Sequence, residues 1–206
     1  MSIQTWKGRP VPWVARWSGE VCADPLSVGE FEDGTCRVFY VDGNEVRDEH
    51  DVLWMREGIT RAGEPQFGEV SIYRQRASMR KRLCQVCGQK IISPVIRWLV
   101  HPEQIVPRDD GTALTMSPPT CDSCVDLSMV ACPVMKHEDK RVIARVLEYE
   151  VWGVLGIVAR FDEMGRGQQT TGRNMIDYSR TDYPFNFQQV VAKQQVVRWT
   201  KFRVEG

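Results

Sequence analysis

The sequence predicts an α+β protein, and three observations lead to this class. Residues 1–66 contain short apolar–polar alternations separated by Gly and Pro, a pattern typical of strands. Residues 67–138 begin with a helical pattern and contain two closely spaced pairs of cysteines. Residues 139–206 open with two Val- and Ile-rich segments that favour paired strands, and a helical pattern follows them. We expect the three regions to form one compact unit.

Composition limits the functions that this chain can have. The formal net charge at pH 7 is zero, which argues against nucleic-acid binding through bulk charge alone. No run of about 18 apolar residues is present, so we expect no membrane-spanning helix. The first residues also lack the apolar core of a signal peptide. Seven cysteines, four of them at metal-binding spacing, favour a reducing cytoplasm over a disulfide scaffold.

The N-terminal region predicts a small antiparallel sheet. Residues 11–17 alternate in polarity, with Trp13 and Trp17 on one side of the expected strand. Residues 37–41 form a second expected strand, and the Gly-containing turn at 42–44 closes it. Residues 52–55 form the third.

Residues 69–83 predict a helix, because the segment lacks Pro and Gly and places Ile72, Met79 and Leu83 on one face. The second half of this segment has no acidic residue between its cations, which are Arg74, Arg76, Arg80, Lys81 and Arg82. Cations near a helix C-terminus interact favourably with the helix dipole. The same residues would also suit a phosphate-facing patch for nucleic acid, or a site for an acidic protein.

Two Cys-x-x-Cys pairs follow, Cys84 with Cys87 and Cys121 with Cys124. Four thiolates in two such pairs suit one tetrahedral, structural Zn²⁺ ion. Gly88 permits a tight knuckle after the first pair. The second pair precedes a helical pattern, which places it on the first turn of a helix. We therefore expect a treble-clef zinc finger between the N-terminal antiparallel β region and a C-terminal β-hairpin plus helix.

The last region predicts two paired strands over residues 141–149 and 151–161, with Gly153 and Gly156 marking bulges or close packing. A Gly-rich polar loop over 162–174 lacks the ending of a P-loop and is expected to be a hairpin tip. A short strand is expected near residues 175–179. We predict a helix from Phe185 to about Phe202, although its β-branched tail would also suit a strand.

Residues 84–132 resemble the zinc-bearing HNH endonucleases, in which two Cys-x-x-Cys pairs frame a ββα finger. His101 falls where the catalytic His would lie, and residues 105–111 fall where the following loop would lie. The resemblance implies a His that activates water beside a divalent ion. Val100 and Val125 stand where that family carries ligands for the second ion. The framework is therefore expected without a complete nuclease site.

The helix before Cys84, the PPTCDSCVDLSMVACP block and the C-terminal segments also resemble a group of actinobacterial proteins with the same two pairs. That resemblance implies an α+β protein with a structural zinc. It includes Cys132 in the motif, so Cys132 is a candidate reactive thiol, with packing in the helix as the alternative.

Two functions follow as hypotheses. The first is a zinc-stabilised binding or interaction protein, whose partner is nucleic acid or an acidic protein at residues 74–82. The second is an enzyme, either an HNH-like phosphodiesterase centred on His101 or a small-molecule-modifying enzyme with a pocket beside the finger. The four thiolates leave zinc no open position, so we expect binding rather than catalysis. A balanced charge and many aromatic residues would also fit a homo-oligomer interface.

Overall fold

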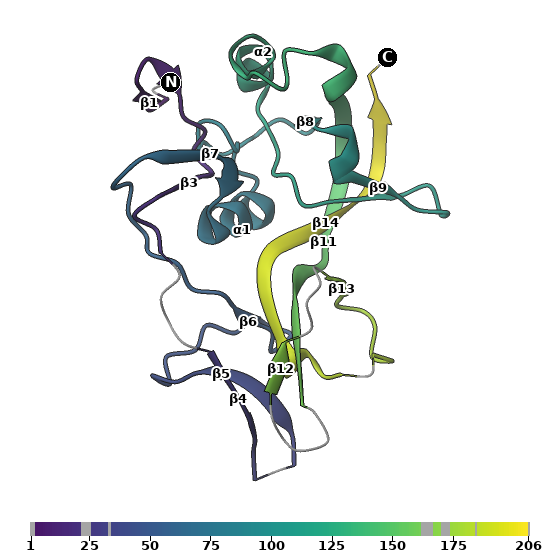
Figure 1. The fold of residues 1–206 in the computed structure, drawn as a ribbon. Helices are drawn as coiled ribbons and strands as arrows, with labels where there is room; N and C mark the ends of the chain where they lie inside the picture. Colours follow the sequence, from purple (N-terminus) through teal and green to yellow (C-terminus); the bar gives the residue numbers. More distant parts are fainter. Residues whose placement is uncertain are drawn as a thin grey trace.

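Two long antiparallel strands, β11 (Val142–Phe161) and β14 (Val190–Val204), form the centre of the main sheet (Figure 1). The computed structural model describes residues 3–21, 26–32, 34–161, 167–169, 174–183 and 185–205. Within them the fold is α+β, with two α-helices and a mixed main sheet. The pairing of β11 and β14 shifts register at several points between Val146 and Gly156. Such bulges bend a strand pair and increase its twist.

Shorter strands extend the main sheet on both sides of this central pair. Strands β8 (Ile96–Val100), β13 (Asn174–Asp177) and β12 (Gly167–Gln169) pair with β11. Strands β10 (Ala113–Thr115) and β6 (Leu53–Trp54) pair with β14, and β9 (Ile105–Pro107) pairs with β10. The largest apolar core lies at the β8 end of the sheet, around Trp98 and Trp199.

The N-terminal region forms three antiparallel strand pairs. They are β1 (Thr5–Trp6) with β2 (Arg9–Pro10), β3 (Ala15–Trp17) with β7 (Pro65–Val70), and β4 (Leu26–Glu30) with β5 (Cys36–Tyr40). The predicted antiparallel β region is confirmed, but the single small sheet expected there is wrong, because these pairs are separate two-stranded sheets. The segment predicted as a third strand contains β6, which runs parallel to β14. The N-terminal region therefore contributes a strand to the same sheet as the C-terminal region.

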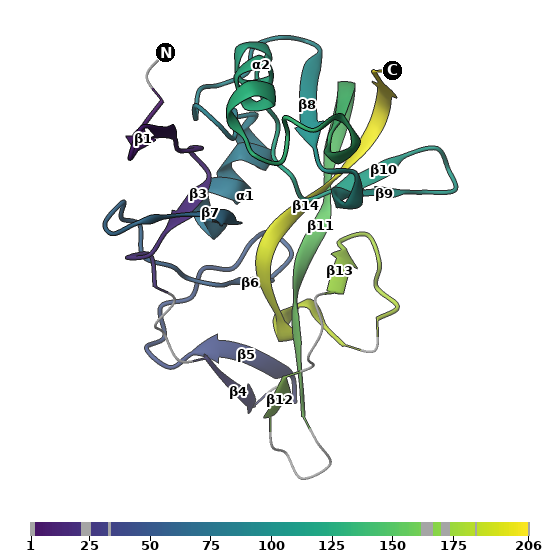
Figure 2. The same cartoon turned by 45° about the horizontal axis from the view of Figure 1, so that its top comes forward.

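The helix predicted over residues 69–83 is confirmed as α1 (Ile72–Lys81), and α2 (Asp122–Ala131) begins beside the second cysteine pair. Ser71 caps α1, because its hydroxyl accepts a hydrogen bond from the Arg74 backbone N–H at 3.3 Å. Helix α1 packs against β14, whereas α2 lies beside β8 (Figure 2). The described residues also contain three short 3₁₀ turns, η1 (Pro102–Gln104), η2 (Glu138–Lys140) and η3 (Phe187–Gln189).

The predicted C-terminal helix is wrong, and the strand alternative for its tail is correct. Residues 190–204 form β14, preceded only by the turn η3. Consecutive apolar residues, such as Val190 with Val191 and Val196 with Val197, are all buried. A bulge inserts an extra residue and interrupts the alternation of buried and exposed side chains along a strand. The spacing of the buried residues in β14 therefore resembles that of a helix. The first half of β14 is largely buried, and β6 and β10 pair with parts of its edge opposite β11, a setting that favours valine.

The two strands predicted over residues 141–149 and 151–161 are a single strand, β11, so the expected hairpin between them is absent from the described structure. The long antiparallel partner of β11 is β14, which begins about 30 residues later in the sequence, after β12 and β13. Most of the Gly-rich loop predicted over 162–174 lies outside the described residues. The short strand predicted near 175–179 is confirmed as β13.

Gly153 and Gly156 permit the close approach of strands, as their sequence context predicted. A Cβ atom on Gly153 would lie 1.9 Å from the Ile176 carbonyl oxygen, and one on Gly156 would lie 2.6 Å from that of Val191. We expect Gly153→Ala to lower the free energy of unfolding by about 2 kcal/mol or more, because β13 must move away from β11. Urea denaturation would measure this loss. Gly68→Ala is the control, since no atom lies within 4 Å of its Cβ position; an equal effect of the two substitutions would contradict the prediction.

Helix α1 is fixed to the sheet by a buried glutamine. The Gln75 side chain donates to the carbonyl oxygens of Met116 and Gln195 at 2.8 and 2.9 Å, and it accepts from the Gln195 backbone N–H at 2.9 Å. Both glutamines are fully buried. Because buried amides require hydrogen-bond partners, these contacts fix the position of α1 over the bulged part of β14.

Candidate metal centre

The first cysteine pair lies in a tight knuckle between α1 and β8. The Gly88 N–H donates to the Cys84 carbonyl at 2.8 Å, and the Cys84 N–H donates to the Gln89 carbonyl at 2.8 Å. Gly88 has a φ of +73° and faces the Trp13 ring, which would lie 2.7 Å from a Cβ atom there. The predicted need for glycine after the pair is confirmed, and the contact with Trp13 adds a second reason for it.

The second pair lies at the start of α2, as predicted. Cys121 is the N-cap residue and Cys124 is in the first turn. The Cys121 backbone N–H points at the first pair and donates to Cys84 Sγ at 3.4 Å. The positive end of the α2 dipole therefore lies beside the sulfur atoms, where it favours negative charge.

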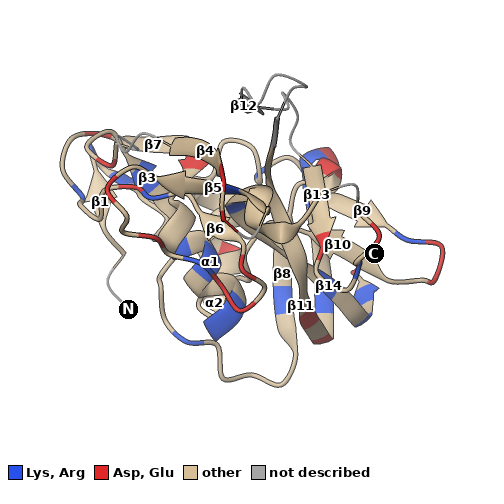
Figure 3. Cartoon of the chain, turned by 90° about the horizontal axis from the view of Figure 1, so that it is seen from below, with Lys and Arg blue, Asp and Glu red and all other residues tan. Residues whose placement is uncertain are grey.

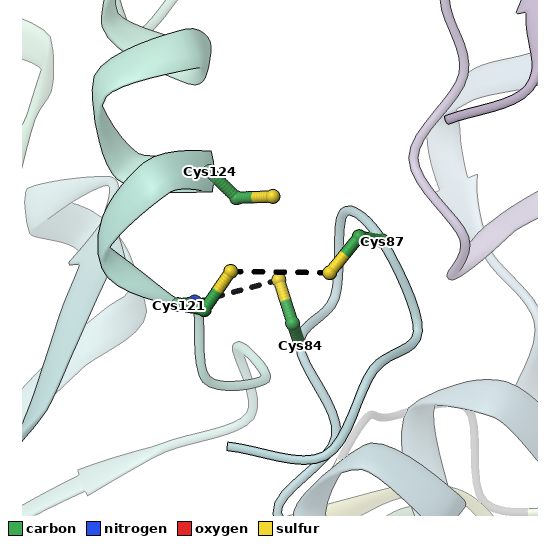
Figure 4. A group of neighbouring side chains, drawn as sticks. All are labelled: Cys84, Cys87, Cys121 and Cys124. Carbon is green, nitrogen blue, oxygen red and sulfur yellow. Dashed lines mark hydrogen bonds between the residues drawn. The ribbon is translucent and has the colours of Figure 1, made fainter. Parts of the chain in front are cut away.

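All four predicted metal ligands converge (Figure 4). The Sγ atoms of Cys84, Cys87, Cys121 and Cys124 lie within 4.8 Å of one another. Cys87 Sγ and Cys121 Sγ are 3.8 Å apart. Sulfur atoms about 2.3 Å from a tetrahedral zinc ion are separated from each other by about 3.8 Å. In the described part of the chain, no other group of three or more Cys, His, Asp and Glu side chains is arranged to hold a metal ion.

The surroundings of the thiols fit a cation. Burial raises the pKa of Cys84 to about 12 and also raises the pKa of Cys124. Burial acts the same way on Cys121, but its hydrogen bonds with Ser123 and Cys124 lower its pKa below the ordinary value. Buried thiols that resist ionisation become thiolates when a divalent ion supplies the compensating charge. The donor set, its spacing and its burial therefore fit one zinc ion held by four sulfur ligands.

Residues around the knuckle tie the centre to the rest of the molecule. Gln85 donates from its backbone N–H to the Pro119 carbonyl, and from its side chain to Thr120 Oγ1, both at 2.8 Å. The backbone N–H groups of Trp13 and Val14 donate to the Val86 and Gln85 carbonyls at 2.9 and 3.0 Å. The N-terminal segment, the knuckle and the segment before α2 are thus joined. Sequence reasoning missed these contacts, because Gln85 is a variable position of the first Cys-x-x-Cys pair and Trp13 lies about 70 residues earlier in the chain.

The two catalytic candidates follow different elements of the fold, and neither is a member of the sulfur cluster. His101 follows β8 and caps η1, where its Nδ1 accepts from the Glu103 backbone N–H at 3.3 Å. Cys132 is the half-buried C-cap of α2, and its backbone N–H donates to the Ser128 carbonyl at 3.0 Å. Trp98 of β8 is fully buried and donates to the Ser117 carbonyl at 2.8 Å, so it offers no exposed ring for stacking on a base.

Arg74 does not belong to a surface patch, which corrects the prediction for this residue. It is 5% exposed, and its Nη1 and Nη2 donate to the two Glu20 carboxylate oxygens at 2.7 and 2.6 Å. Nη2 also donates to the Ala15 carbonyl at 2.8 Å. Glu20 is fully buried and accepts a further hydrogen bond from the Trp17 N–H at 2.9 Å. Arg74 therefore joins α1 to the segment around β3.

Most of the other predicted patch residues also contact groups within the chain. Arg80 pairs with Glu49, with one contact at 3.1 Å, and Arg82 donates to the Ser93 carbonyl at 2.8 Å. The Arg76 guanidinium lies over the Trp54 ring, 4.1 Å from its centroid. Lys81 is exposed and has no partner among the described residues. Acidic residues are interspersed with the basic ones around α1 (Figure 3), so these five cations do not form one open phosphate-facing surface.

Comparison with known proteins gives no relative: the chain matches no family model, no curated protein and no solved structure. Within its described residues, neither helix is long and apolar enough to cross a bilayer.

Proposed function

We propose that this is a zinc-stabilised binding protein in which the zinc ion is structural. The observation that carries the proposal is the convergence of four cysteine sulfurs from two segments to within 4.8 Å of one another. Four protein ligands fill the coordination positions of zinc, whereas a catalytic zinc keeps one position for water or substrate. The ion would hold the knuckle against the start of α2, and the chemistry it supplies there is the charge that stabilises four thiolates.

The order of elements supports a treble-clef arrangement around that ion. The knuckle of Cys84 and Cys87 comes first, the hairpin of β9 and β10 follows, and α2 carries the second pair on its first turn. Strand β8 lies between knuckle and hairpin and pairs with β11 instead. We infer that the finger is built into the main sheet, with β8 as the connection.

Two observations favour binding over the nuclease alternative. His101 has no second group of metal ligands beside it in the described residues, since the one group that meets the spacing is the cysteine cluster. The side chain instead accepts a hydrogen bond within its own turn, where it stabilises η1.

Nucleic-acid binding through residues 74–82 also loses support, because the ion pairs of Arg74 and Arg80 already neutralise those cations.

Metal analysis combined with a nuclease assay tests the proposal. We expect one zinc ion per chain and no cleavage of single- or double-stranded DNA or RNA in the presence of Mg²⁺ or Mn²⁺. A chain without zinc would contradict the proposal. So would cleavage that disappears in the His101→Ala variant while the zinc content stays at one, because that result would establish a catalytic site at His101.

A further inference from the structure

The four cysteines of the cluster are not equally accessible to solvent. Cys84 and Cys124 are fully buried, and Cys87 is only 8% exposed. Cys121, the N-cap residue of α2, is half-buried and is the most exposed member of the cluster. A small reagent that arrives from solvent would therefore reach Cys121 more readily than the other three cysteines.

Cys121 also lines a small cavity beside the cluster. One wall of the cavity comes from the loop between the knuckle and β8, and the other wall comes from residues 120–122 at the start of α2. Its volume is about 170 Å³, well above the roughly 10–15 Å³ that a single water molecule requires. None of the other three cysteines lines it. The cavity is therefore large enough to bring a molecule of the size of hydrogen peroxide to one of the four metal ligands.

A second sulfur atom lies within reach of Cys121. Cys87 Sγ is 3.8 Å from Cys121 Sγ, and the two side chains point toward each other from the knuckle and from the start of α2 (Figure 4). The sulfur atoms of a disulfide are about 2.05 Å apart, so the two are in contact without being bonded. The Ser123 hydroxyl lies 3.6 Å from Cys121 Sγ and could donate to an oxygen atom beside that sulfur.

We propose that Cys121 is an oxidation site of the metal centre, that its substrates are hydroperoxides, and that the product is a disulfide between Cys121 and Cys87. This inference rests on the proposed function, because a zinc ion holds the four cysteines as thiolates, and thiolates rather than thiols react with peroxides.

With hydrogen peroxide, the reaction has two steps. The Cys121 thiolate attacks one peroxide oxygen, the O–O bond breaks, and the sulfur becomes a sulfenic acid while hydroxide leaves. The Cys87 thiolate then attacks that sulfur, so the S–S bond forms, the S–O bond breaks and a second hydroxide leaves. Two protons from solvent convert both hydroxides into water, and the two sulfurs lose the two electrons that the peroxide gains.

Oxidation removes two of the four sulfur ligands, so the closed tetrahedral site no longer exists and the zinc ion is released. The disulfide joins the same two segments that the ion joins. The knuckle therefore stays attached to α2 in the oxidised protein, with a covalent bond in place of the metal ion.

Treatment of the zinc-loaded protein with hydrogen peroxide tests the inference. A chromophoric chelator measures the zinc that is released, and peptide mass spectrometry after alkylation of the free thiols identifies the disulfide. We expect one zinc ion to be released per chain and one disulfide to form between Cys87 and Cys121. A thiol reductant with added zinc is expected to reverse both changes.

The variant Cys121→His separates metal binding from oxidation, because histidine binds zinc but cannot form a disulfide. We expect this variant to release its zinc in peroxide at least tenfold more slowly than the parent protein. Cys132→Ser is the matched control, since Cys132 is also half-buried and lies at the other end of the same helix. Its loss is expected to leave the rate of zinc release unchanged.

A disulfide within either Cys-x-x-Cys pair of the parent protein would overturn the inference, whether or not the histidine variant binds zinc. Two other results would also overturn it. One is a parent protein that keeps its zinc in peroxide that oxidises free N-acetylcysteine in the same buffer, and the other is equal release from the parent and Cys121→His. Protein purified without zinc would instead contradict the proposed function, so the two failures are distinguishable.

Discussion

Replacing Cys84 by serine is expected to abolish zinc binding and to lower the free energy of unfolding by at least about 5 kcal/mol, which approaches the whole stability of a typical domain. This large loss is expected because the cysteine cluster is part of the largest apolar core. Cys84, Cys87 and Cys124 belong to the same apolar core as Met79, and this core also contains Trp98 and Trp199. A knuckle released from α2 would open that core to water. Urea denaturation followed by circular dichroism, with and without a chelator, measures the loss.

Cys132→Ser is the matched control for this substitution. Cys132 is half-buried at the end of α2 and is not part of the sulfur cluster. We expect that variant to keep its zinc and to lose less than about 1 kcal/mol, because Cys132 caps α2 through its backbone N–H, which serine retains. Two results would show that the fold does not depend on a metal ion. One is a Cys84→Ser variant as stable as the parent, and the other is a parent protein whose stability does not change when a chelator is added.

Replacing Arg74 by methionine is expected to cost about 3–5 kcal/mol, because it leaves the Glu20 carboxylate buried without its partner. Glu20 is fully buried and receives both Arg74 nitrogens. Thermal or urea unfolding measures the loss. The variant Arg198→Met removes a partly exposed pair with Glu150, joined at 2.7 Å, and is expected to cost less than about 1 kcal/mol.

A double-mutant cycle separates the ion pair from the packing of the arginine stem. The combined Glu20→Met and Arg74→Met variant is expected to be more stable than either single variant, because no buried charge then lacks a partner. Losses that simply add would mean that the two side chains do not interact in solution.

The local patterns of this chain predicted its cluster of four cysteines and its first helix. Ligand spacing is a short-range property, so Cys84 with Cys87 and Cys121 with Cys124 could be identified from the sequence alone. The same holds for α1, whose uninterrupted helical segment ends near Arg82, where the backbone enters the left-handed region at φ +56°.

Long-range partners explain what the sequence did not predict. The run of cations in α1 does not indicate that Arg74 pairs with Glu20, because Glu20 lies 54 residues earlier in the sequence. The buried amides of Gln75 and Gln195 are 120 residues apart and carry no pattern. The bulges that made β14 resemble a helix arise from its pairing with β11, which no window of local sequence contains.

X-ray absorption at the zinc edge tests the central claim most directly, because it reports the type, number and distance of the atoms bound to the metal. Zinc copurified with the chain is predicted to have four sulfur neighbours at about 2.3 Å and no oxygen or nitrogen neighbour. Those sulfurs would belong to Cys84, Cys87, Cys121 and Cys124, and each Cys→Ser variant would lose the signal together with the metal. An oxygen or nitrogen atom bound to the zinc would contradict a closed structural centre. It would indicate a coordination position that water or a substrate can occupy, as in a catalytic zinc site.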